Sequence, residues 1–85
     1  MSKIVEYTVE RFDYDIETQL ENKKVHQGII SCLQWMVDEE PSLQRGMVGY
    51  LIVKHQNEIK ECDIQIDYLQ QEREHFLNNL GATKD

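Results

Sequence analysis

The chain has 85 residues and a formal charge of −7, from 9 basic and 16 acidic side chains. A chain of this size forms one domain at most, and folding buries only roughly 60% of the surface that it exposes when unfolded. The charge disfavours direct nucleic-acid binding, because phosphate is repelled, and favours a protein partner with a basic surface.

The cellular location follows from what the sequence lacks. The longest apolar-rich run, residues 47–53, is shorter than the ~18 residues that a membrane-spanning helix needs. The first ten residues do not have the pattern of a secretory signal peptide. We therefore expect a cytoplasmic protein without membrane contact, in which Cys32 and Cys62 stay reduced. Both cysteines fall in apolar helical patterns and are expected to pack as small hydrophobic side chains.

The first 22 residues carry two overlapping patterns. Apolar and polar residues alternate over 5–10, which suits a strand. A longer helical face is formed by Val5, Val9, Phe12, Ile16 and Leu20. We expect helix from about Thr8 onward and leave residues 2–7 open between strand and helix.

A second apolar run extends the N-terminal helical region to residue 39. One broad helical face is formed by Ile29, Ile30, Leu33, Met36 and Val37. Gly28 either separates two helices or lies inside one, where it costs about 1 kcal/mol. Pro41 ends the region, because a proline biases the preceding residue, Glu40, away from helical backbone. One or more helical segments are therefore predicted over 8–39.

The most regular pattern predicts one long helix over 42–80. Residues on one face alternate by four and three, which is the heptad period of a coiled coil. This set, called the seam, comprises Val48, Ile52, His55, Ile59, Cys62, Ile66, Leu69, Arg73, Phe76 and Leu80. His55 and Arg73 are polar residues within this apolar row, and they could fix the register of the helix pairing. Gly81 is expected to close the helix, before a disordered tail at 81–85.

Together these patterns predict an all-α fold in a single domain, 1–85. We expect a helical hairpin or a three-helix arrangement with one long C-terminal coiled-coil-like helix. Leu51 and Leu77 widen the seam, which fits N-terminal helices that fold back on it. The seam is either the self-association surface of a homo-oligomer, with a dimer favoured, or the intrachain core of a hairpin. The small size of the chain favours self-association.

A row of acidic residues follows the N-terminal helical pattern. The carboxylate stripe comprises Glu6, Glu10, Asp13, Glu17 and Glu21, and Asp15 lies nearby. If this segment is helical, the stripe docks on a basic groove of a partner protein or is the solvated face of an amphipathic helix. Trp35 is a further candidate for partner binding, and it lies either at the core edge or in an interface.

Common sequence motifs for catalysis, phosphate binding and metal binding are absent. There is no phosphate-binding loop, nucleophile elbow or zinc protease pair. His26, His55 and His75 do not combine with the two cysteines at the spacing of metal ligands. We therefore expect no catalytic residue, no metal and no cofactor.

The carboxylate stripe on an oligomeric scaffold favours a binding protein that inhibits or adapts another protein. In size, charge and helicity the chain resembles small acidic accessory proteins of phages and mobile elements, although the resemblance covers no motif. It implies an accessory or anti-defence role in the host cytoplasm. Two alternatives are a structural or chaperone-like helical assembly factor and an oligomer that sequesters a small ligand, such as a nucleotide.

Overall fold

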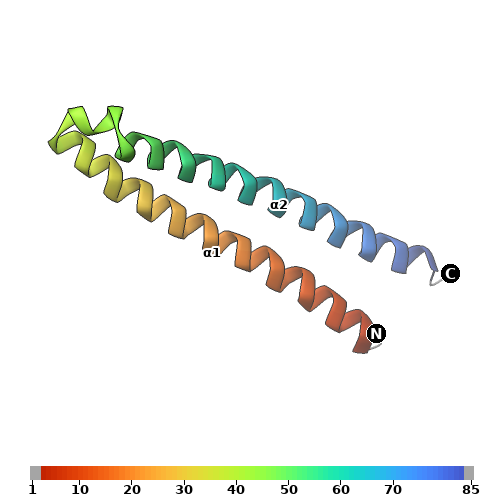
Figure 1. Cartoon of the computed structure of the whole chain (residues 1–85). Helices are drawn as coiled ribbons and strands as arrows, with labels where there is room; N and C mark the ends of the chain where they lie inside the picture. The colour runs from red at the N-terminus through yellow and green to blue at the C-terminus, as the bar shows by residue number, and fades with distance from the viewer. Residues whose placement is uncertain (1–2, 84–85) are drawn as a thin grey trace.

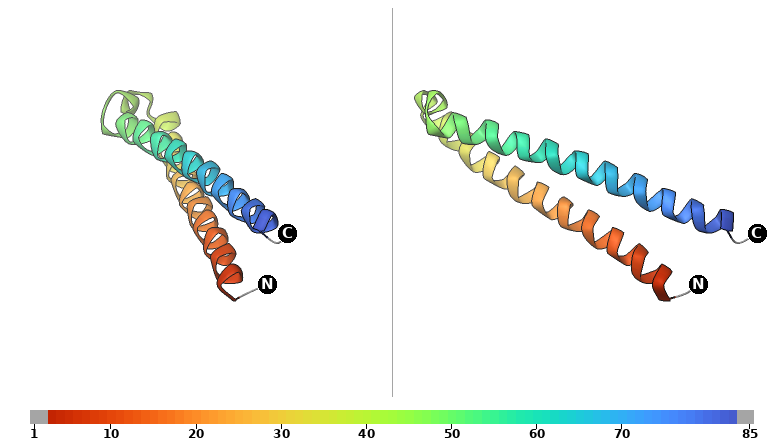
Figure 2. Two further views of the ribbon diagram at one scale, coloured as in Figure 1. Left: turned by 90° about the vertical axis from the view of Figure 1, so that its right-hand side faces the viewer. Right: turned by 45° about the vertical axis from the view of Figure 1, so that its right-hand side comes forward.

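The computed structural model describes residues 3–83, and the side chains of residues 3–80. Helix α1 (Lys3–Glu39) and helix α2 (Met47–Thr83) are joined by a short 3-10 turn, η1 (Pro41–Arg45). The helices lie side by side and antiparallel (Figures 1 and 2). The start of α1 and the end of α2 lie at one end, the free end, opposite the turn end. The all-α prediction is confirmed over the described residues, in a molecule of 64 × 17 × 14 Å.

Helix α1 is continuous, which makes the molecule a hairpin rather than a three-helix arrangement. It begins at Lys3, so the first described residues are helical and not extended. It passes through Gly28, where an added Cβ would meet no atom within 4 Å apart from the neighbouring backbone of α1 itself. Helix α2 continues through Gly81 to Thr83. The last part of the predicted disordered tail, residues 84–85, lies outside the described residues.

The turn between the helices follows from one proline and one glycine. Glu40 has φ −137° and ψ 87°, outside the helical region, because Pro41 follows it. The backbone N–H of Leu43 then donates to the carbonyl oxygen of Glu40 at 3.0 Å. A Cβ on Gly49 would overlap the carbonyl oxygen of Gln44. Glycine at this position therefore lets η1 pack against the first turn of α2.

The seam packs against α1 along the whole hairpin. Ile52 and Cys62 are buried, and the other eight seam residues are half-buried. Ten residues of α1 show the same alternation of four and three and are also buried or half-buried: Val5, Val9, Phe12, Ile16, Gln19, Lys23, His26, Ile30, Leu33 and Val37. Near the free end, the rings of Phe12 and Phe76 have centroids 6.1 Å apart. Contact of the seam with a second copy stays a prediction.

The packed face of α1 differs from the expected one at its centre. The apolar pattern predicts Leu20 on this face, but Leu20 is 43% exposed, and its neighbour Gln19 is half-buried instead. The reason is the heptad period, because three residues after Ile16 the helix presents Gln19 to α2. The middle of the contact is therefore more polar than its ends.

The buried core is small, as expected for two helices that meet along one line. Three hydrophobic side chains of residues 3–80 are buried, at 5%, 8% and 6% exposure, namely Val37, Ile52 and Cys62. None of the side chains that the structure describes is fully enclosed. Stability therefore depends on many partial contacts along the seam.

A substitution in the seam tests this packing. We expect Ile52→Ala to lower the free energy of unfolding by about 2 kcal/mol, the low end for such truncations, because the site is close to solvent. Ile64→Ala is the matched control, since Ile64 is 58% exposed on α2. It should change the free energy by less than about 0.5 kcal/mol. Urea unfolding followed by circular dichroism measures both, and equal losses would contradict the assigned seam.

The two cysteines provide a second test. Burial, reinforced by the nearby carboxylates of Glu58 and Asp63, raises the pKa of the Cys62 thiol. Cys32 is exposed on α1. Because the thiolate is the reactive form, iodoacetamide at about pH 8 should label Cys32 at least about tenfold faster than Cys62. Peptide mass analysis measures the rates, which should converge in urea. Equal rates in the folded protein would show that Cys62 is not packed as described.

Candidate partner-binding surface

The carboxylate stripe lies on α1 in the free-end part of the hairpin. All five of its side chains are exposed. Because residues three and four apart are neighbours on a helix, the carboxylates form a continuous row. From Glu6 to Glu21 the row extends over roughly 22 Å at the helical rise per residue.

Basic residues of the chain neutralise the stripe only in part. The Nε atom of Arg73 donates to the Asp13 carboxylate at 2.8 Å, which links α2 to α1. Lys24 and Glu21 are 3.8 Å apart, and both are exposed, so this pair contributes little. The remaining stripe residues form no ion pair with any residue that the structure describes: Glu6, Glu10 and Glu17. These three carboxylates are available to a cationic partner.

Asp15 does not belong to this row. It is two residues from both Asp13 and Glu17, and residues at that spacing do not share a helix face. Its side chain is half-buried, and its Oδ1 lies 3.4 Å from the Nε of Arg11. Of the acidic residues predicted to bind a partner, Asp15 is therefore placed on another side of α1.

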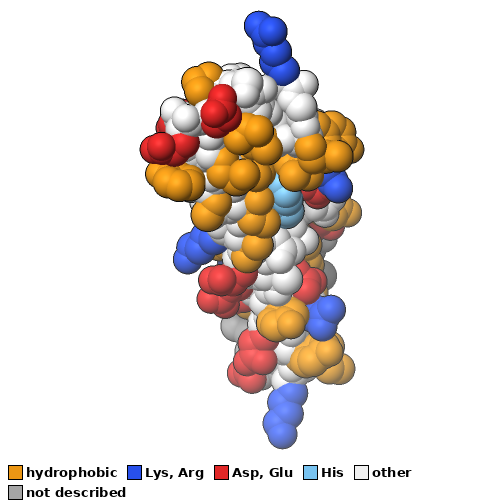
Figure 3. All heavy atoms as spheres, turned by 60° about the vertical axis from the view of Figure 1, so that its left-hand side comes forward, with side chains coloured by type: hydrophobic (Ala, Val, Ile, Leu, Met, Phe, Trp, Pro, Cys, Tyr) orange, Lys and Arg blue, Asp and Glu red, His pale blue; other side chains and the backbone are white. Residues whose placement is uncertain are grey.

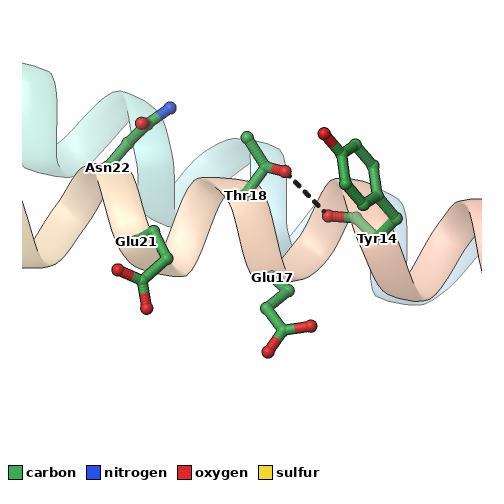
Figure 4. Close-up of a pocket in the computed structure, with 5 residues that line it drawn as sticks. All are labelled: Tyr14, Glu17, Thr18, Glu21 and Asn22. Carbon is green, nitrogen blue, oxygen red and sulfur yellow. Dashed lines mark hydrogen bonds between the residues drawn. The ribbon is translucent and has the colours of Figure 1, made fainter.

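One part of the stripe borders an open hollow of about 300 Å³ on α1. Figure 4 shows Glu17 and Glu21 directed to the same side of the helix, one turn apart. The ring of Tyr14 and the side chain of Thr18 are directed away from them, and the Thr18 hydroxyl donates to the Tyr14 carbonyl oxygen at 2.9 Å. Two neighbouring carboxylates suit the charge-assisted hydrogen bonds of a lysine or arginine side chain.

A second hollow, of about 380 Å³, includes residues of both helices near the free end. It is lined by Glu6, Val9 and Glu10 of α1 and by Arg73 and Leu77 of α2. Apolar side chains and carboxylates therefore occur together in this hollow. That combination suits a long basic side chain, whose methylene stem packs on apolar groups while its charged end reaches an acid.

The hairpin concentrates negative charge at its free end. Segments 3–21 and 58–80 lie side by side and contain twelve Asp and Glu residues against four Lys and Arg. The segment 22–57, which forms the turn end, contains three Asp and Glu against four Lys and Arg. Sequence reasoning missed the contribution of α2, because the two acidic segments are far apart until the helices pair.

Trp35 lies in the turn-end half of α1, away from the unpaired stripe carboxylates. Its side chain is 65% exposed. It lines an open apolar hollow of about 480 Å³ with Ser31, Cys32 and Met36. The structure therefore does not bring Trp35 together with the carboxylate stripe, so Trp35, like Asp15, lies apart from the row of carboxylates.

Two histidines meet across the helices, a contact that the sequence pattern does not predict. The Nδ1 atoms of His26 and His55 are 2.8 Å apart and half-buried, so one ring donates and the other accepts.

Among the described residues, no group of three or more His, Cys, Asp or Glu side chains could hold a metal ion. Over the described residues, no stretch of α1 or α2 has the sustained apolar character that a membrane-spanning helix requires.

Comparisons of the chain with models of protein families, with curated proteins and with solved structures found no match.

Proposed function

We propose that the chain is a small acidic protein-binding protein that inhibits or adapts a partner protein. It docks the carboxylate stripe on a basic surface of that partner. The observation that carries this proposal is the row of exposed carboxylates on α1, three of which have no cationic partner among the described residues.

The electrostatics of the free end support this kind of recognition. Twelve acidic and four basic residues share segments 3–21 and 58–80, so a strong negative field surrounds this half. Such a field accelerates encounter with a basic surface and disfavours acidic partners. At physiological salt the field decays over about 8 Å, so the contact itself has to engage the stripe directly.

The helical scaffold supports the proposal in a second way. The stripe lies on a continuous helix whose other side packs on α2, so its carboxylates keep their spacing before binding. A preorganised surface loses less conformational entropy on association than a flexible acidic tail does. An extended basic groove, or a basic helix of a partner, matches the shape of this row.

Charge reversal on the stripe tests the proposal. The variant Glu6→Lys, Glu10→Lys, Glu17→Lys changes three unpaired carboxylates and leaves the Asp13–Arg73 pair intact. We expect it to weaken partner binding by at least about tenfold, because lost and reversed contacts add. The partner is first identified by capture from a native cell extract with mass analysis. Calorimetry with the purified partner then gives the dissociation constants.

A matched control distinguishes the effect of the carboxylate stripe on affinity from the effect of net charge. The variant Glu39→Lys, Glu61→Lys, Glu72→Lys changes the charge equally at exposed helical positions outside the stripe. It should retain most of the affinity, and circular dichroism should show both variants folded. If the control loses affinity as the stripe variant does, only overall charge matters. If neither loses affinity, the proposed docking surface is wrong.

A further inference from the structure

One apolar face of α1 is not covered by α2. This outer face comprises Val25, Gly28, Ile29, Cys32, Trp35 and Met36. All six residues are exposed, with Val25 at 58% and Trp35 at 65%. Figure 3 shows hydrophobic side chains gathered over the turn end of the molecule, which comes forward in that view. The face is therefore confined to the turn-end half, where the carboxylate stripe is absent.

The outer face has the spacing of a second helix-packing surface. Val25, Ile29, Cys32 and Met36 alternate by four, three and four, which is the period shown by the seam. A stripe of this period fits the side of another helix. Gly28 lies at its edge and has open space where a Cβ would be, so the chain itself does not fill this site. A helix from outside could approach closely there.

We propose that a second copy of the chain covers the outer face, with the two α1 helices antiparallel. In this arrangement Val25 of one copy faces Met36 of the other, and Ile29 faces Cys32. Both pairs are related by the same two-fold axis, which passes beside Ile30 and Ser31. The face is thus complementary to itself, as a two-fold interface requires.

The charge distribution favours this orientation of the second copy. The overlapping segments come from the turn end, where three acidic and four basic residues occur over 22–57. The acidic free ends of the two copies then point in opposite directions. A parallel arrangement would instead place two strongly acidic segments side by side, where like charges repel. Two chains of charge −7 therefore approach best at their turn ends.

The size of the outer face determines the expected affinity of the dimer. Its exposed apolar area is on the order of a few hundred Å², about half of what each partner buries in an interface of standard size. The hairpin itself encloses no described side chain fully, so added burial stabilises it. We therefore infer a dimer that forms reversibly with concentration. It leaves the free ends open and does not rest on the proposed function.

Sedimentation equilibrium of the full chain from about 1 µM to about 1 mM tests the dimer. The wild-type mass should approach twice 10.1 kDa as concentration rises. Val25→Lys with Cys32→Lys should raise the dissociation constant at least about tenfold, because charge enters the apolar interface. The control, Ile64→Lys with Tyr68→Lys, adds the same charge at positions 58% and 57% exposed on α2 and should associate as wild type.

A second measurement uses the unaltered protein and so does not depend on how a variant folds. Alkylation of Cys32 should slow as wild-type concentration rises, since the dimer covers this thiol. Three outcomes would overturn the proposal. The chain could stay monomeric at the highest concentration, or the alkylation rate of Cys32 could be independent of concentration. The third outcome is an equal loss of association in both lysine variants.

Discussion

The line of contact between α1 and α2 is the constraint on which the rest of the molecule depends. Each helix presents a row of residues spaced four and three apart, and a row of that period can follow a neighbouring helix over its full length. The contact is narrow, so three of the side chains described over 3–80 are buried and the others in the two rows stay partly exposed. Most of the described residues outside this line are exposed, and for that reason one short chain presents long, separate surfaces along its 64 Å length.

Apolar packing alone would leave the register of the two helices weakly fixed, because successive heptads resemble one another. Polar contacts across the seam distinguish the observed register from its neighbours. Lys23 lies 2.8 Å from Asp63, and the His26 and His55 rings meet at 2.8 Å. A slip by one heptad would move these partners by roughly 10 Å and leave half-buried polar groups unpaired. The polar residues in the middle of the seam therefore reduce the buried apolar area but fix the register of α1 against α2.

The seam of α2 was visible in the sequence because its apolar residues keep the heptad period from Val48 to Leu80. The matching row of α1 cannot be recognised from the sequence, because the polar residues Gln19, Lys23 and His26 interrupt it. Leu20, which is exposed, continues the apolar pattern in their place. Helical continuity through Gly28 was likewise undecidable from local propensity, since long packing contacts outweigh one unfavourable residue. Ion pairs such as Asp13–Arg73 join residues sixty positions apart, and single-chain patterns carry no signal for them. The position of the carboxylate stripe on one exposed face, by contrast, follows from helical spacing alone.

Because the chain folds back on itself, its free end is strongly acidic and its turn end is nearly neutral. Acidic residues that are dispersed over both outer segments become neighbours at the free end, where their mutual repulsion opposes closure of the hairpin. The ion pair between Arg73 and Asp13 reaches across this end and relieves only part of that repulsion. A basic surface placed against the stripe would relieve more of it, so the same repulsion that opposes the isolated hairpin adds to the free energy of binding. The nearly neutral turn end carries no such penalty, and the apolar side chains of α1 can be exposed there for contact with another copy.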